Sequence, residues 1–246
     1  MTQQIRQLAA WMKAAESIVF FGGAGVSTQS GIPDFRSAHG LYAGPHGKTY
    51  EEMLHVDYML TYPQPFWDFY RSVMLYPDAK PNTAHQTLAE MEKAGRLTAV
   101  VTQNIDGLHQ AAGSENVLEL HGSVHRNYCT GCGRRFTLAD LLPMPTVPLC
   151  PHCGGSIRPD VVLYGEPLDD SVTARALEAI RSCDLLIVGG TSLVVYPAAG
   201  MIQYRRARCN LALINKDKTT YDDQAELVLH GDVGQALSGA WSLAQV

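Results

Sequence analysis

Four of the six cysteines lie in two Cys-x-x-Cys pairs, a spacing that is typical of metal sites. Cys129 and Cys132 bracket Thr-Gly, Cys150 and Cys153 bracket Pro-His, and seventeen residues separate the two pairs. Two such pairs bring four thiolates to one ion, so the spacing predicts a zinc ribbon. Four protein ligands leave no position for water or substrate, so we expect the zinc to be structural and the chemistry to lie elsewhere.

Two other interpretations of these cysteines are weaker. The N-terminus carries no secretion signal, so we expect a reducing compartment, which disfavours disulfides. A redox Cys-x-x-Cys motif is disfavoured because two pairs are present and neither opens a helix beside a strand. The remaining Cys183 and Cys209 are predicted to be small core residues.

A second set of polar residues follows three apolar, strand-like runs. The segments are "TQNIDGLH" at 102–109, "LHG" at 120–122 and "GGTSLVVYPA" at 189–198. Ligands of α/β proteins bind at the carboxyl ends of parallel strands, so all three segments point to one crevice. Each has an ordinary alternative: Asn104 and Asp106 as turn caps, His121 as a strand-end histidine, Thr191 as a helix cap.

The stretch "IVFFGGAGVSTQSGIPDFR" at 18–36 opens like a dinucleotide site, with a strand followed by glycines that let a pyrophosphate approach the backbone. It then departs from that pattern. Where a hydride-transfer enzyme continues into an amphipathic helix, this chain runs through Gly31, Pro33, Asp34, Phe35 and Arg36. This difference argues against hydride transfer.

Short apolar runs alternate with helical patterns along the chain, which predicts an α/β fold with a doubly wound, mostly parallel, Rossmann-like sheet. The predicted strands are 18–21, 99–102, 117–120, 184–188, 211–214 and 226–229. The predicted helices are 5–15, 82–94, 171–182, 198–206 and 233–243.

Two stretches break this alternation and predict an inserted smaller lobe that contains the zinc ribbon. We expect one catalytic domain over 1–246, in which a large domain comprises about 1–40, 80–124 and 160–246. The small lobe then comprises a helical part, about 41–79, and the zinc ribbon, about 125–159.

The overall composition excludes several classes of protein. The 246 residues are 46% hydrophobic and carry a formal net charge of −5, without the basic excess of a nucleic-acid binder. No run approaches the roughly 18 to 20 apolar residues that span a bilayer. We therefore expect a cytoplasmic protein that binds neither membrane nor nucleic acid, and we expect a monomer because nothing suggests an obligate oligomer.

In combination, "GAGVSTQSGIPDFR", "TQNID", "LHG", the cysteine pairs, "GTSLVVYPA" and a late "GDV" resemble, in this order, the bacterial type of the sirtuin family of NAD-dependent protein lysine deacylases. The resemblance covers about 5–243. It implies an enzyme that consumes NAD as a co-substrate, keeps one structural zinc and acts on acylated-lysine proteins or peptides.

The resemblance also implies roles for individual residues. His121 matches the catalytic histidine, which acts as a general base on the ribose hydroxyls, and Asn104 belongs to the catalytic pocket that holds the departing nicotinamide. The implied NAD-binding residues are Gly23, Ala24, Gly25, Thr28, Asp34, Phe35, Arg36, Gln103, Asn104, Ile105, Asp106, Gly190, Thr191, Ser192, Asn215, Asp232 and Val233. The implied peptide-binding residues are Val162, Tyr164, Gly165, Glu166, Leu193, Val194 and Tyr196, from two segments that accept the substrate by strand addition.

In the implied reaction, the acyl-lysine oxygen attacks C1′ of the ribose as nicotinamide leaves, and the 2′-hydroxyl, activated by His121, then takes the acyl group. The products are nicotinamide, 2′-O-acyl-ADP-ribose and free lysine. Family members that prefer acidic acyl groups carry a tyrosine and, three residues on, an arginine. Here Tyr70 is followed by Val73, so we expect acetyl or other uncharged acyl groups.

Two other functions remain open at this point. A protein nucleophile attacking the same activated ribose would give a mono-ADP-ribosyltransferase, although His121 argues against this as the main activity. A non-catalytic zinc-ribbon module that senses NAD or ADP-ribose is the other alternative, which the intact "TQNID" and "LHG" segments disfavour.

Overall fold

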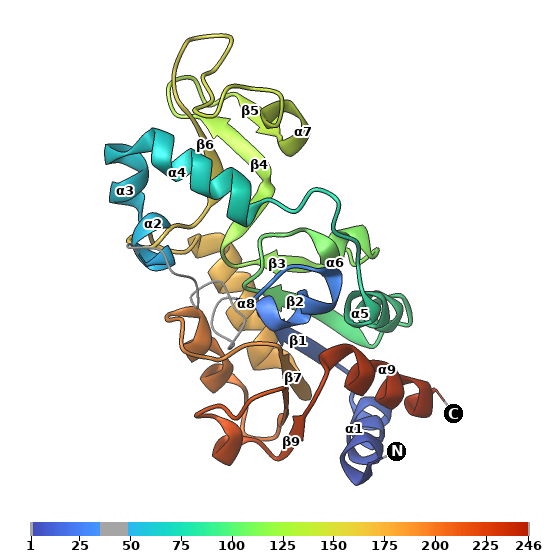
Figure 1. Ribbon diagram of the computed structural model, residues 1–246. Helices are drawn as coiled ribbons and strands as arrows, with labels where there is room; N and C mark the ends of the chain where they lie inside the picture. The colour runs from blue at the N-terminus through green and yellow to red at the C-terminus, as the bar shows by residue number, and fades with distance from the viewer. Residues whose placement is uncertain (1, 35–48, 246) are drawn as a thin grey trace.

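The computed structural model describes residues 2–34 and 49–245, and its larger part is built on a six-stranded parallel sheet (Figure 1). The strand order is β3-β2-β1-β7-β8-β9. The strands are β1 (Ile18–Gly22), β2 (Leu97–Thr102), β3 (Val117–Glu119), β7 (Leu185–Gly189), β8 (Asn210–Asn215) and β9 (Leu227–His230).

The central strands are continuous apolar runs because both faces of the sheet are covered. Every residue of β1 is buried. Its side chains alternate between two cores, with Ile18 and Phe20 in one and Val19 and Phe21 in the other. The sheet therefore forms the middle layer of three.

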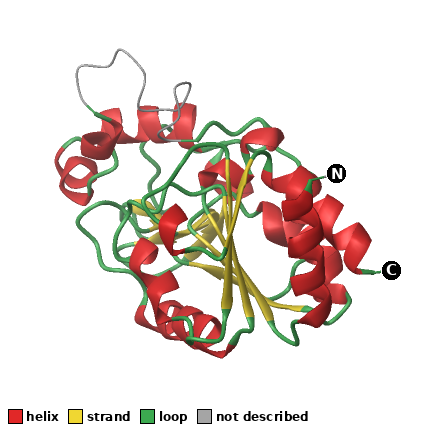
Figure 2. Cartoon of the chain, turned by 90° about the horizontal axis from the view of Figure 1, so that it is seen from below, coloured by secondary structure: helices red, strands yellow, loops and turns green. Residues whose placement is uncertain are grey.

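Helices cover the two faces of this sheet, as Figure 2 shows with the strands seen between them. One face packs against α1 (Gln3–Ala14), α5 (Thr83–Lys93) and α9 (Val233–Ala244), and the other against α8 (Asp170–Ser182) and the 3₁₀ helix η5 (Ala198–Tyr204). Asn82, Asp169 and Asp232 accept backbone N–H groups at the starts of α5, α8 and α9, which fixes where these helices begin.

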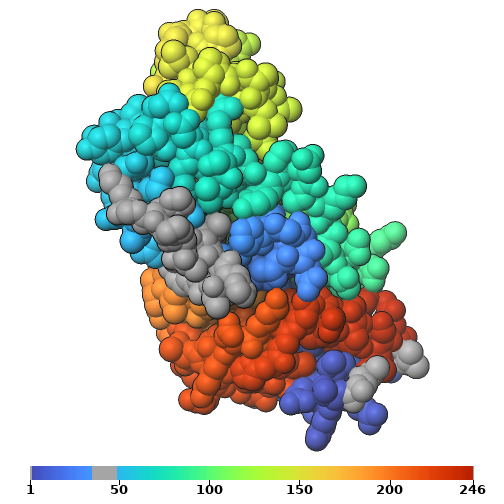
Figure 3. Space-filling view, viewed as in Figure 1, coloured from blue at the N-terminus to red at the C-terminus, as the bar shows by residue number. Residues whose placement is uncertain are grey.

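The smaller part contains a three-stranded antiparallel sheet, in order β5-β4-β6, and a group of short helices. Its elements are β4 (Gly122–Cys129), β5 (Arg135–Thr137), β6 (Ile157–Val161), α2 (Tyr50–Met53), α3 (Val56–Thr61), α4 (Pro63–Phe69), the π-helical turn η4 (Tyr70–Met74) and α7 (Leu138–Leu141). These elements share a third hydrophobic core that includes Phe66, Tyr70 and Leu141. In Figure 3 the helices α2, α3 and α4 (cyan) and the segment that contains the two cysteine pairs (yellow-green) lie together at one end of the molecule.

The remaining short helices lie in connections of the larger part. They are η1 (Ala24–Val26), η2 (Thr28–Ser30), α6 (Leu108–Ala111) and η6 (Asp222–Gln224). Within the described residues, no helix combines the length and the apolar character needed to cross a membrane.

The predicted fold class is confirmed, with all six predicted strands present in one parallel sheet. The helix predicted at 198–206 is present as the 3₁₀ helix η5 (Ala198–Tyr204) rather than as an α-helix. The chain closes i to i+3 bonds there, such as Gly200 N–H to the carbonyl of Pro197, at 3.0 Å. The strands β4 to β6 were not predicted individually.

Candidate functional site

A cavity of about 770 Å³ opens where the strand order reverses. From β1 the chain adds β2 and β3 on one side, whereas β7, β8 and β9 extend the sheet on the other. The loops after β1 and β7 therefore diverge and leave a crevice at the carboxyl ends of these strands. Residues of the smaller part, such as Val124 and Leu163, line the same cavity, so it lies between the two parts.

Glycines allow the loops after β1 and β7 to touch. The N–H of Gly25 donates to the carbonyl of Gly190 at 2.8 Å. A Cβ on Gly25 would lie 2.8 Å from the Cα of Gly190, and one on Gly23 would lie 2.7 Å from the Cβ of Thr191. Gly190 itself has a φ of +62°, a conformation that favours glycine.

The structure brings most of the predicted NAD-binding residues to this cavity. Those that line it are Ala24, Gly25, Thr28, Asp34, Gln103, Asn104, Ile105, Asp106, Gly190, Thr191, Ser192, Asn215, Asp232 and Val233. Gly23 is not part of the lining but permits the close approach of Thr191. Phe35 and Arg36 lie outside the described residues.

His121 lies in the cavity wall, in the two-residue connection between β3 and β4, and is held in one tautomer. Its Nδ1–H donates to the carbonyl of Gln103 at 2.9 Å, and because a carbonyl only accepts, Nε2 is left with its lone pair. Burial lowers the pKa of His121 below its ordinary value of 6.5, while the bond to Gln103 opposes this effect. The imidazole is therefore neutral near pH 7 and ready to accept a proton.

A chain of hydrogen bonds fixes the "TQNID" segment in the wall of the cavity. Asn104 Nδ2–H donates to Ser27 Oγ at 3.0 Å, and the Ser27 hydroxyl donates to Asp106 Oδ2 at 2.6 Å. The other oxygen of Asp106 accepts the N–H of Leu108 at 2.9 Å, at the start of α6. The side chains of Asn104 and Asp106 are thus oriented by contacts within the protein.

Two buried side-chain amides at the cavity have N–H donors without an acceptor among the described residues. Gln103 Nε2 and Asn215 Nδ2 are buried and make no hydrogen bond, although the oxygens of both amides are used, by Thr191 Oγ1–H at 2.8 Å and Thr191 N–H at 2.9 Å. Buried donors without partners are costly, so their presence in a cavity wall fits a polar ligand such as a dinucleotide.

The predicted peptide-binding segments lie at the same cavity, but two of the predicted residues do not line it. Val162, Tyr164, Gly165, Glu166 and Tyr196 line it, but Leu193 and Val194 do not. Leu193 is in the second core, at 1% exposure, while Val194 is 47% exposed.

The carboxylate of Glu166 is already bound within its own loop. It accepts from both terminal nitrogens of Arg158, at 2.7 and 2.8 Å, and from the N–H of Leu163 at 2.9 Å. This side chain therefore stabilises the turn after β6.

The side of the cavity formed by the smaller part is mostly apolar, with His125 of β4 as a polar exception. Val73 and Met74, in the π-helical turn, line it together with Leu138 and Val161. Tyr70, three residues before Val73, is fully buried against Phe66 and does not line the cavity.

The neighbouring Arg71 also points elsewhere. Its guanidinium donates to the carbonyls of Leu141, Leu142 and Pro145, at 2.9 to 3.2 Å. The tyrosine and arginine arrangement for acidic acyl groups is therefore absent from residues 70–74.

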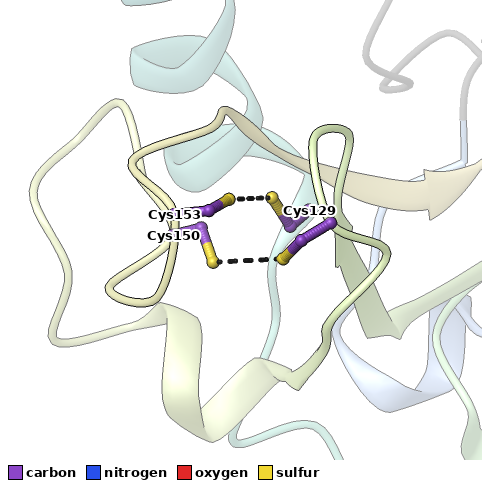
Figure 4. Close-up of side chains that lie close together, drawn as sticks. Cys129, Cys150 and Cys153 are labelled. Carbon is purple, nitrogen blue, oxygen red and sulfur yellow. Dashed lines mark hydrogen bonds between the residues drawn. The ribbon is translucent and has the colours of Figure 1, made fainter.

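The four cysteines of the two pairs converge on one point, as Figure 4 shows for the labelled Cys129, Cys150 and Cys153. All four sulfurs lie within 4.8 Å of one another. The closest approaches, 3.4 Å from Cys129 to Cys153 and 3.8 Å from Cys132 to Cys150, are too long for disulfides, whose sulfurs lie about 2.05 Å apart. This donor set fits a tetrahedral structural zinc.

Sequence reasoning missed several residues of the site. Ser27 is 1% exposed and joins Asn104 to Asp106, but a serine in a glycine-rich turn gives no signal of such a role. Lys216, Asp217 and Lys218 also line the cavity, beyond β8. Their charges, next to the predicted NAD-binding residue Asn215, were the only available signal.

Comparison with known proteins agrees with this geometry. The model of the Sir2 family matches residues 23–197. Proteins called NAD-dependent protein deacetylase, from Clostridium acetobutylicum and Staphylococcus aureus, are 53% and 45% identical, and each alignment covers 95% of this chain and 96% of the relative.

Solved structures are similar over almost the whole chain as well. One described as Sir2-p53 peptide-NAD+ has a TM-score of 0.85 at 38% identity and covers 97% of this chain and 96% of its own. Another, Sir2Tm bound to a propionylated peptide, has a TM-score of 0.84 at 37% identity and covers 95% of both chains. By matches of this extent, the chain belongs to the Sir2 family.

Proposed function

We propose that this protein is an NAD-dependent protein lysine deacetylase, which moves the acyl group from lysine to the ADP-ribose of NAD and releases nicotinamide, 2′-O-acyl-ADP-ribose and free lysine. Relatives with this name are similar over nearly their full length. The observation that carries the proposal is His121, a neutral imidazole with a free Nε2 in the wall of a cavity at the switch point of the sheet.

NAD supplies a ribose carbon with nicotinamide as its leaving group. In our proposal, Asn104 and Asp106 orient the nicotinamide, since Ser27 already holds both side chains. Gln103 and Asn215 donate their unpaired amide N–H groups to the nucleotide. His121 Nε2 takes a proton from a ribose hydroxyl, and Nδ1–H remains on the Gln103 carbonyl, so the imidazolium is stabilised as it forms.

We infer that the acylated peptide enters as an extended strand between the segments after β6 and β7. Tyr164 and Gly165 on one side and Tyr196 on the other line the cavity. The buried Leu193 contributes through its backbone alone. Strand addition binds the main chain, so sequence preference is weak.

The acyl group itself is expected to be uncharged. Val73 and Val161 present apolar surface to the cavity, and Arg71 is occupied by three carbonyls. An acidic acyl group would bury its carboxylate there without a cation, which is costly.

We also propose the division of the chain given by the sequence, with the small lobe near 41–79 and 125–159. Its support is the separate third core; β4 and β6 extend a few residues beyond these borders, to Gly122 and Val161. We further propose a cytoplasmic monomer that binds acylated-lysine proteins and no nucleic acid.

The deciding experiment mixes the protein with NAD and an acetyl-lysine peptide and follows peptide mass, nicotinamide and acyl-ADP-ribose by mass spectrometry. His121→Ala is the control. Stoichiometric formation of all three products, lost in the control, supports deacetylation. Nicotinamide release with the peptide still acetylated would point to ADP-ribosyl transfer or NAD hydrolysis, and binding of NAD without turnover to a sensor.

A further inference from the structure

Cys183 and Cys209 form a buried pair of thiols that the proposed function does not use. Their sulfurs lie 3.5 Å apart, and the residues are 0% and 3% exposed. Cys183 follows the last turn of α8, and Cys209 immediately precedes β8. Neither residue lines the cavity.

This pair differs in kind from the four-cysteine cluster. Among the described residues, a group of three or more ligand atoms suited to a metal occurs at Cys129, Cys132, Cys150 and Cys153, and the other two cysteines belong to no such group. Two thiols without further ligands are poorly suited to zinc, which takes four. Two thiols at 3.5 Å are, however, within a small movement of the roughly 2.05 Å of a disulfide.

The two thiols are not equivalent. The hydrogen bond from Cys183 lowers the pKa of the Cys209 thiol, and the cations Arg205 and Arg206 act in the same direction, although burial opposes them. The pKa of Cys183 is raised, first by its bond to Cys209 and then by burial. Cys209 is therefore the sulfur that ionises first and attacks.

We propose that Cys183 and Cys209 are a redox modification site at which a peroxide closes an intramolecular disulfide. The Cys209 thiolate attacks one peroxide oxygen, the O–O bond breaks, and the product is a sulfenic acid with one water. The Cys183 sulfur then attacks the Cys209 sulfur, the S–S bond forms, and the hydroxyl leaves as a second water with the remaining thiol proton. Hydrogen peroxide is reduced to two waters, and two thiols are oxidised.

Access to Cys209 comes through a local opening of the chain before β8. Residues 206–208 are exposed, and the N–H of Cys209 closes a turn on the carbonyl of Arg206 at 2.9 Å. A turn with exposed residues opens more readily than the strand behind it, so a molecule as small as a peroxide reaches the sulfur while the core stays closed.

The position of the pair determines the effect of the disulfide. The sulfurs lie at the amino ends of β7 and β8, whereas the cavity lies at the carboxyl ends. The bond closes a loop that contains β7, η5 and the segment 190–197. It should therefore restrict the unfolded chain and raise thermal stability while deacetylase activity is retained.

The test treats reduced, zinc-loaded protein with increasing hydrogen peroxide, blocks remaining thiols with N-ethylmaleimide under denaturing conditions, and maps unreduced tryptic peptides by mass spectrometry. We expect peptide 182–205 joined to peptide 209–216, with the loss of two hydrogens, before a metal indicator detects released zinc. We also expect a thermal midpoint higher by roughly 5 °C, reversed by dithiothreitol.

The variants Cys183→Ala and Cys209→Ala serve as controls, and each should lose the peroxide-dependent rise in the midpoint. The mapping on the unsubstituted protein keeps the test valid if a variant is unstable. Alkylation of both cysteines after the cluster has lost zinc would overturn the proposal. So would a stable sulfinic acid at Cys209, or a bond from either cysteine to a cluster cysteine.

Discussion

At the scale of single residues, His121 determines how activity depends on pH. Burial lowers its pKa below 6.5, so the base is neutral over a wider range than a free histidine. We expect kcat/KM for an acetyl peptide to rise with pH, to reach half its maximum below pH 6.5, and to be level at pH 7 to 8. Initial rates in buffers of constant ionic strength measure this, and a midpoint above 6.5 would contradict the assigned base.

Val73 is the residue that we expect to decide the charge of the accepted acyl group. The substitution Val73→Arg places a cation in the apolar wall, where it pairs with the distal carboxylate of a succinyl group. We expect kcat/KM for a succinyl peptide to rise about tenfold or more, equivalent to ~1.4 kcal/mol, and the acetyl rate to fall. Val73→Leu adds volume without charge and should leave succinyl activity low; equal effects of the two variants would refute the role of charge.

The site residues show where sequence reasoning reaches its limit. His121 and Asn104 stand next to strand ends, so their motifs identify them before the fold is known. The role of Ser27 depends on its hydrogen bond with Asn104, which lies 77 residues away in the sequence, and no local sequence pattern predicts such a contact. Val73 faces the cavity from a π-helical turn, and its lining position depends on that irregular backbone.

At the scale of elements, the buried strands were predicted best. An uninterrupted run such as Ile18 to Phe21 has few alternatives to a central parallel strand, and the structure extends it by one residue, to Gly22. The strands of the small sheet were not predicted because β5 is short and polar, and because β4 does not alternate regularly between buried and exposed residues: its pairing with β6 shifts register between Ser123 and Asn127. The cysteines, not periodicity, identified that region.

The contact between the loops after β1 and β7 gives a prediction about Gly25. Its Cβ in Gly25→Ala would lie 2.8 Å from both the Cα and the carbonyl oxygen of Gly190, so the loops must separate. We expect the KM for NAD to rise at least about tenfold and stability to fall by about 1–3 kcal/mol. Steady-state kinetics and urea unfolding measure the two effects.

Gly239→Ala is the matched control for that substitution. Gly239 lies inside α9, and a Cβ there would meet Ile5 at an ordinary 3.7 Å. Alanine should stabilise this helix by up to ~1 kcal/mol and leave the KM for NAD unchanged. An unchanged KM in Gly25→Ala as well would show that the loop contact does not shape the site.

Helices α5 and α6 meet through two buried histidines, His85 and His109, whose ring centres lie 4.7 Å apart. Burial lowers the pKa of His85 to about 4, against a smaller opposing effect of Asp106, and burial together with His85 lowers that of His109 to about 3. Between pH 6.5 and 4 the unfolded chain therefore binds protons that the folded protein does not. Each histidine then removes about 1.4 kcal/mol of stability per unit of falling pH.

His109→Phe tests this contribution. Both ring nitrogens of His109 lack hydrogen-bond partners among the described residues, so a phenyl ring loses no bond and cannot be protonated. We expect the slope of unfolding free energy against pH to decrease by about 1.4 kcal/mol per unit between pH 6.5 and 4. His85 remains in this variant and should still contribute its own part of the slope. An unchanged slope in His109→Phe would mean that this ring is protonated in the folded protein.

At the scale of the whole molecule, the cavity lies between two parts that are stabilised to different extents by their hydrophobic cores. The larger part has two cores on either side of a six-stranded sheet, while the smaller part has one core and a three-stranded sheet. The loop region of the smaller part, from Cys129 to Cys153, is tied by the sulfur cluster. We therefore expect zinc to contribute directly to the folding of that part and only indirectly to the rest.

Removal of zinc by a strong chelator should destabilise the smaller part and leave the larger part folded. We expect amide hydrogen exchange to accelerate in β4, β5 and β6 while amides of β1, β7 and β8 stay protected. Activity should be lost, because Val124, Leu138 and Val161 form one wall of the cavity. Hydrogen-exchange mass spectrometry with and without zinc re-addition measures this. Simultaneous loss of protection in both sheets would mean that the molecule folds as one unit, and full activity without zinc would mean that the cavity wall stands without the metal.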